Sequence, residues 1–198
     1  MKPIKKKHLK RNVFTFVLLY SFILVSCTKE DGIEITEDVD LSTQAEVNAF
    51  SKRNVKRLLG NLTIGGSIDD ISSLNKLTYV SGRLAIYRSS LEDFTGLENL
   101  TTVDHLDITY NKFLTSFAGL DNVKISSRLI IRNNTILTTL LGLSSNVSYQ
   151  ENEVIDIIEI IENDKLINID GITNLRVIGS IKITDNPSLQ NLDGLRGL

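Results

Sequence analysis

A repeating pattern of hydrophobic residues covers the chain from Val55 onward. Each unit begins with two aliphatic residues separated by one other residue, and successive units begin 22, 22, 23, 29 and 23 residues apart. These pairs are Leu62/Ile64, Leu84/Ile86, Leu106/Ile108, Leu129/Ile131, Ile158/Ile160 and Ile181/Ile183. Because side chains alternate across a strand, both residues of a pair face the same side. One unit cannot bury this row alone, so the pattern predicts a solenoid whose neighbouring units cover each other.

Further hydrophobic positions recur every three residues in the later part of each unit. In the four most regular units they are Leu114/Phe117/Leu120, Leu137/Leu140/Leu143, Leu166/Ile169/Ile172 and Leu189/Leu192/Leu195. A glycine usually precedes the last position, at Gly119, Gly142, Gly171 and Gly194. A spacing of three suits a tight 3₁₀-like or irregular return with one inward row. The prediction is a mostly β fold with short returns between strands.

An asparagine occupies the same phase in four units. These residues are Asn111, Asn134, Asn163 and Asn186. At a turn, an asparagine amide bonds backbone groups of its own coil and of the adjacent coil. One such residue would be a plain turn residue, whereas four at one phase predict a ladder that satisfies polar groups buried by stacking.

Residues 42–53 predict a helix outside the repeat. Ser42 or Thr43 would begin it, and Glu46 lies three residues after Thr43, as a capping box requires. Its apolar side would comprise Ala45, Val47 and Phe50. A solenoid needs a cover at its open end, and we expect this helix to supply it.

The 29-residue step contains an insertion between Asn146 and Ile155. A long loop on a rigid scaffold is a common position for binding residues. The insertion is equally well explained as simple variation in unit length.

The first 31 residues predict export. Six Lys and Arg residues with no acid precede Val13–Val25, an apolar run of thirteen residues. As a helix this run spans ~20 Å, short of the ~30 Å hydrocarbon core, which favours a secretory signal over an anchor. The run ends in Leu24-Val25-Ser26-Cys27, which resembles a bacterial lipobox. The resemblance implies cleavage after Ser26 and a diacylglyceryl lipid on Cys27 that anchors residues 27–198 to a membrane.

Residues 27–40 are expected to form an acidic tether. Lys29, Glu30 and Asp31 resemble the export signal that places lipoproteins of the Bacteroidetes on the outer face of the outer membrane; a solvated acidic linker explains the same residues. Without residues 1–26 the chain holds 16 Lys and Arg against 24 Asp and Glu, a formal net charge of −8. This acidic balance argues against nucleic acid as a partner.

Residues 41–198 are expected to form one repeat domain. The unit from Leu106 to Val123 is similar to units of the receptor L-domain family, which has a leucine-rich-repeat type of architecture. The resemblance implies a right-handed β-solenoid, and the family's motif positions concern its core and carry no ligand specificity. The sequence ends within a unit, which suggests either a piece of a longer protein or a self-associating edge.

Composition argues against an enzyme. The chain has one cysteine, which excludes an internal disulfide, and two histidines, of which His8 would leave with the signal. His105 alone supports no catalytic triad. The acid pairs Asp69/Asp70 and Glu92/Asp93 lack the spacing of a calcium loop and are interpreted as solvated loop acids. We therefore expect no catalytic residues, metal or cofactor.

Outward positions of the predicted strands form a candidate binding surface. It comprises Arg83, Tyr87, Arg88, His105, Asp107, Thr109, Tyr110, Arg128 and Arg132. Arginine and aromatic side chains on a flat sheet suit recognition of protein or carbohydrate, although ordinary sheet surface is an equally simple interpretation. The sequence thus favours a non-catalytic surface lipoprotein that serves in binding or adhesion. The alternative is a structural envelope component that assembles through an uncovered solenoid edge.

Overall fold

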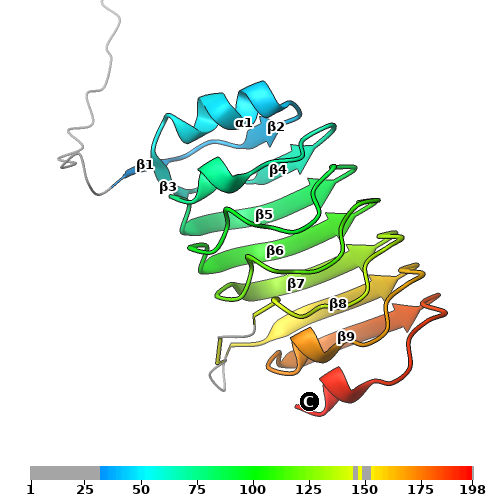
Figure 1. The fold of residues 1–198 in the computed structure, drawn as a ribbon. Coiled ribbons are helices and arrows are strands. Elements are labelled where there is room, and N and C mark those ends of the chain that lie inside the picture. The colour runs from blue at the N-terminus through cyan, green and yellow to red at the C-terminus, as the bar shows by residue number, and fades with distance from the viewer. Residues whose placement is uncertain (1–31, 145–146, 149–152, 198) are drawn as a thin grey trace, which may run out of the picture.

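The computed structural model describes residues 32–144, 147–148 and 153–197, and the description below concerns these residues. The predicted signal segment 1–26, its cleavage residue Ser26, the lipidation site Cys27 and the first part of the tether lie outside them, as do residues 146 and 149–152 of the insertion before Ile155. The described chain is mostly β and forms a parallel β-solenoid of about six turns (Figure 1).

One parallel sheet runs the length of the solenoid. Its strands pair in the order β1-β3-β5-β6-β7-β8-β9. Off this series, β2 pairs with β4, and β4 pairs with β5. The strands are β1 (Ile33–Ile35), β2 (Val39–Leu41), β3 (Val55–Leu58), β4 (Leu62–Gly65), β5 (Tyr79–Tyr87), β6 (Thr102–Thr109), β7 (Lys124–Arg132), β8 (Ile155–Ile161) and β9 (Val177–Thr184). Later coils therefore replace two short strands with one long strand.

The aliphatic pairs align across the sheet as predicted. Leu84 and Ile86 of β5 lie opposite Leu106 and Ile108 of β6, and all four are fully buried. The same alignment continues through β7 and β8 into β9. In β9 Ile181 is 37% exposed, because no other described strand pairs with the outer edge of β9.

The returns between strands are built from tight turns, which confirms the predicted 3₁₀-like geometry. Three of them contain 3₁₀ helices, η1 (Ser72–Leu74), η2 (Asp170–Ile172) and η3 (Asp193–Leu195). The coils approach closely at the glycine of each return: a Cβ on Gly171 would collide with the carbonyl oxygen of Leu140. Gly119 adds a positive φ of 97°, a conformation that suits glycine.

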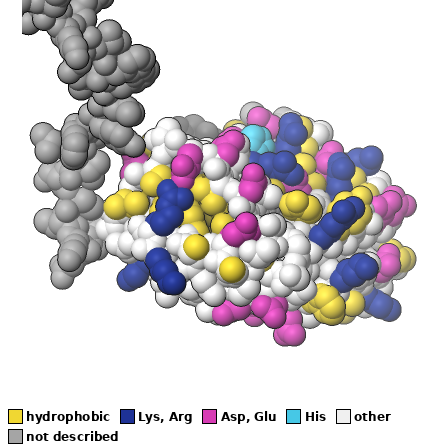
Figure 2. Space-filling view, turned by 90° about the horizontal axis from the view of Figure 1, so that it is seen from above, with side chains coloured by type: hydrophobic (Ala, Val, Ile, Leu, Met, Phe, Trp, Pro, Cys, Tyr) yellow, Lys and Arg dark blue, Asp and Glu magenta, His cyan; other side chains and the backbone are white. Residues whose placement is uncertain are grey.

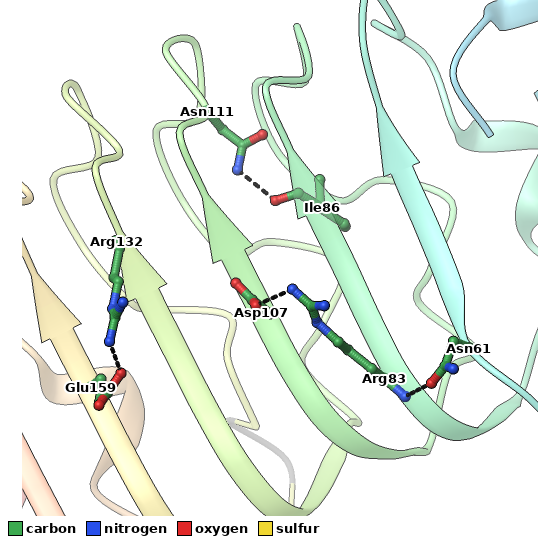
Figure 3. A network of polar contacts seen from close by, with 7 residues as sticks. All are labelled: Asn61, Arg83, Ile86, Asp107, Asn111, Arg132 and Glu159. Carbon is green, nitrogen blue, oxygen red and sulfur yellow. Dashed lines mark hydrogen bonds and ion pairs between the residues drawn. The ribbon is translucent and has the colours of Figure 1, made fainter. Parts of the chain in front are cut away.

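The four asparagines form a continuous hydrogen-bonded series at one corner of the coils. Each amide nitrogen donates to a strand carbonyl of the preceding coil, as Asn111 does to Ile86 at 2.9 Å (Figure 3). Each Oδ1 accepts from the backbone N–H of the preceding member, as Asn134 does from Asn111 at 3.1 Å. Ser89 begins the series: its N–H and hydroxyl both donate to Asn111 Oδ1. We call Ser89 and these four asparagines the ladder.

Helix α1 (Gln44–Ser51) lies at the N-terminal end of the sheet and contacts β2 and η1 (Figure 1). Thr43 is its N-cap, and Thr43 and Glu46 form a capping box. Hydrogen bonds from Ser42 and Thr43 hold the pKa of the exposed Glu46 carboxyl below its usual value. The helix is shorter than the predicted 42–53, because Ser42 and Thr43 precede its first turn. Val47 and Phe50 are buried, whereas Ala45 is exposed and does not join the apolar side.

Candidate binding site at the carboxyl ends of the central strands

Every coil leaves the sheet through one residue with a positive φ. These corner residues are Gly66, Arg88, Tyr110, Asn133, Glu162 and Asp185, with φ between 51° and 72°. Glycine, asparagine and aspartate adopt this left-handed conformation more readily than other residues. Other residue types are less stable there by about 1–2 kcal/mol. Arg88, Tyr110 and Glu162 therefore occupy corners for which the backbone favours other residue types.

A hollow of about 480 Å³ lies beside these corners, where β5, β6 and β7 end. It is lined by Arg88, Ser89, Ser90, Tyr110, Lys112, Phe113, Asn133 and Thr135. Tyr110 is 52% exposed and Phe113 is 53% exposed, so both rings are open to solvent. The Arg88 guanidinium carbon lies 5.8 Å from the centre of the Tyr110 ring. The lining combines two aromatic rings and two cations with small polar groups, and it contains no Asp or Glu. We call it the corner hollow.

The ladder fixes the floor of the corner hollow. Ser89 is buried, and its hydroxyl donates to Asn111 Oδ1 at 2.8 Å. On the far side, Asn133 Nδ2 donates to Glu162 Oε2 at 2.7 Å, which joins two neighbouring corners. Because these polar groups are held by neighbouring coils, the hollow is formed before any ligand arrives, which lowers the entropy cost of binding.

The other predicted surface residues align on the outward face of the sheet. Arg83, His105 and Arg128 lie opposite one another in adjacent strands, and so do Tyr87, Thr109 and Arg132. The residues of each of these two sets are therefore neighbours across the sheet. They do not merge with the corner hollow into one continuous site, because Arg88 and Tyr110 lie beyond the strand ends.

Ion pairs within the sheet occupy several of these outward side chains. Arg83 pairs with Asp107, and Arg132 pairs with Glu159 (Figure 3). His105 Nδ1 lies 3.0 Å from Asp104 Oδ2. Basic and acidic side chains are accordingly interspersed around the histidine in Figure 2. The face of the sheet is largely self-neutralised, which reduces its attraction for a charged ligand.

Asp107 is the most enclosed charge on this face. It is buried, and its Oδ1 has no hydrogen-bond partner among the described residues. Arg83, His105, Arg128 and Ile130 surround it in a second hollow of about 330 Å³. The Arg83 backbone N–H donates to Asn61 Oδ1 at 2.8 Å, which fixes this strand beside the preceding coil (Figure 3).

Besides Ser89 and Ser90, which directly follow Arg88, sequence reasoning missed four residues of the corner hollow, namely Lys112, Phe113, Asn133 and Thr135. Phe113 carried a usable signal, since it is an aromatic residue directly before the inward Leu114 and therefore faces outward. The remaining three are polar residues in a turn, and only the fold brings them beside Arg88.

The predicted acid pairs lie together across two coils. Asp69, Asp70, Glu92 and Asp93 border one hollow of about 470 Å³. Over the part of the chain that the structure describes, no three His, Cys, Asp or Glu side chains are grouped to hold a metal ion. Nor is any helix in these ranges long and apolar enough to cross a membrane.

Comparisons of this chain with protein-family models, with curated proteins and with solved structures found no match. A function therefore has to be inferred from the chemistry of the corner hollow and from the sequence.

Proposed function

We propose that the protein is a non-catalytic cell-surface lipoprotein that binds a protein or carbohydrate ligand, in recognition or adhesion. The corner hollow carries this proposal, because it combines the exposed rings of Tyr110 and Phe113 with Arg88 and Lys112 on a rigid floor. Aromatic and arginine side chains contribute strongly to binding at interfaces. A hollow of about 480 Å³ also falls within the range of small-ligand sites.

The finer type of fold is part of the proposal. We assign the solenoid to the right-handed, L-domain-like class of leucine-rich repeats, and the ladder and the recurring 3₁₀ turns support this assignment. We also propose that α1 covers the N-terminal end of the core, which the burial of Val47 and Phe50 supports.

The membrane anchor is proposed from the sequence alone. A basic segment, a short apolar run and the lipobox-like residues before Cys27 support lipidation. The acidic residues that follow Cys27 support display on the outer face of the outer membrane. Binding would then occur outside the cell without covalent chemistry.

A double variant tests the proposed site. The full chain in mild detergent is applied to an array of glycans and proteins, beside the variant Arg88→Ala/Tyr110→Ala. We expect the variant to lose at least about 90% of ligand retention, since loss of two central contacts weakens binding by more than tenfold. Its circular dichroism should match that of the parent chain.

The matched control is Arg57→Ala/Tyr79→Ala. The Arg57 guanidinium carbon lies 3.9 Å from the centre of the Tyr79 ring, so the control removes an equivalent cation–aromatic pair far from the corner hollow. Undiminished binding by Arg88→Ala/Tyr110→Ala, or equal losses in both variants, contradicts the proposed site.

The alternative function is a structural role in the cell envelope, with assembly through the edge of the sheet. It is favoured by the exposure of Ile181 in β9, whose outer edge meets no other strand within the described ranges. Analytical ultracentrifugation of the full chain in detergent separates the two functions. Concentration-dependent association that Ile181→Lys abolishes supports assembly, whereas a monomer at all concentrations contradicts it.

A further inference from the structure

We infer that the corner hollow binds an anionic carbohydrate, with an acidic sugar's carboxylate on Arg88 and Lys112 and its ring against Tyr110 and Phe113. This inference rests on the proposed ligand-binding function and specifies the ligand of the same site.

The charge of the hollow is the first argument. Its eight lining residues include two cations and no carboxylate. Neither Arg88 nor Lys112 forms an ion pair within the described ranges, whereas Arg83 and Arg132 do. A ligand carboxylate supplies the missing charge, and a guanidinium matches its geometry.

The exposed rings are the second argument. Tyr110 and Phe113 are exposed residues, each with about half of its accessible surface open to solvent. The negative face of an aromatic ring attracts the C–H groups on the apolar face of a sugar ring. The hydroxyls of Ser90 and Thr135 and the Asn133 amide lie at the same hollow, where they suit hydroxyl groups of a sugar.

The position of the hollow favours a carbohydrate over an acidic peptide. Extended peptides commonly bind by adding a strand to a free sheet edge. The hollow lies at the ends of β5, β6 and β7, and each of these strands is paired on both sides. No free strand edge is therefore available at this place, and contacts must come from side chains.

The test compares trigalacturonic acid with its fully methyl-esterified form by isothermal titration calorimetry on the full chain in detergent. The two probes share their sugar rings and differ in charge. We expect the acid to bind at least about tenfold more tightly than the ester, the effect of one charge-assisted contact. Arg88→Gln should reduce this difference, because only Lys112 then remains to hold the carboxylate.

Two further variants separate charge from ring contact. Arg176→Gln is the matched control, because it removes an exposed arginine that does not line the corner hollow. This control should leave the affinities for the acid and for the ester unchanged, because the preference for the acid depends on the charge at the hollow and not on the net charge of the chain. Tyr110→Asn should weaken both probes by about tenfold. Its fold should be retained, because asparagine suits a positive φ.

Each outcome is decisive. Equal affinity for acid and ester overturns the anionic assignment and leaves carbohydrate binding intact. Binding of neither probe, together with an array ligand lost in Arg88→Ala/Tyr110→Ala, overturns the carbohydrate assignment and preserves the proposed function. Equal weakening of binding of the acid by Arg88→Gln and Arg176→Gln also overturns the inference. Absence of any array ligand contradicts both proposals.

Discussion

Replacement of Asn134 by alanine should destabilise the solenoid more than any surface change. Asn134 is fully buried in the ladder, and its side chain takes part in four hydrogen bonds. Its Oδ1 accepts from the backbone N–H and the side-chain amide of Asn111. Its Nδ2 donates to the Ile108 carbonyl and to Asn163 Oδ1. Alanine removes all four bonds at a place that water does not reach.

The size of the effect follows from the partners left behind. The Asn111 N–H becomes a buried donor without an acceptor, which costs about 1–3 kcal/mol. Each of the other three bonds contributes about 0.5–1.5 kcal/mol net, so we expect a loss of about 5 kcal/mol. Asn186→Ala should cost less, about 1–2 kcal/mol, because Asn186 is only half-buried and water can replace its bonds.

Urea unfolding followed by far-ultraviolet circular dichroism measures the loss. Asn99→Ala is the matched control: Asn99 is exposed and donates one bond, from Nδ2 to the Asn75 carbonyl at 2.8 Å. It should cost less than about 1 kcal/mol. If Asn134→Ala loses no more free energy than Asn99→Ala, the ladder does not stabilise the stacked coils and the reasoning fails.

Two other predictions concern the helix and the anchor. Hydrogen bonds from Ser42 and Thr43 lower the pKa of Glu46 from 4.5, so its ionised form contributes stability that is present above that value and is lost as the pH falls through the lower folded value. Glu46→Gln keeps a side-chain acceptor, and urea midpoints measured from about pH 7 to about pH 3 should therefore fall less steeply than in the parent chain; identical slopes would contradict this role. For the anchor, cells fed a palmitate analogue should label the parent chain and leave Cys27→Ser unlabelled and released from membranes. Label that persists in Cys27→Ser would contradict Cys27 as the lipidated residue, and a parent chain that takes up no label would contradict lipidation.

The core was predictable because its chemistry repeats. Inward positions such as Leu84 and Leu106 recur with one spacing, and their register in the sheet follows from the pattern alone. The ladder positions were equally regular, since burial of a polar amide at a constant phase demands partners in neighbouring coils. Ser89 escaped detection, because its hydroxyl takes the asparagine's place with a different side chain.

The site was less predictable because it depends on irregular residues. Arg83 lies opposite His105 in register, yet it pairs diagonally with Asp107, and pattern analysis does not distinguish these partners. Lys112 and Thr135 join Arg88 only because three successive coils turn at the same point. Such a hollow arises from corner geometry, which residue spacing does not reveal.

The stacking direction determines how the protein would bear a mechanical load. If a lipid on Cys27 holds the chain and a ligand is bound beside β5–β7, a force between the cell and the ligand acts on the coils of β1–β4. It does not act on β8 and β9. Hydrogen bonds between parallel strands run along the stack, so this pull opens coils one after another. The loaded coils have short, divided strands, and the ladder begins beyond them at Ser89. We therefore expect the coils of β1–β4 to unfold first under force, while the ligand-holding coils of β5–β7 stay folded.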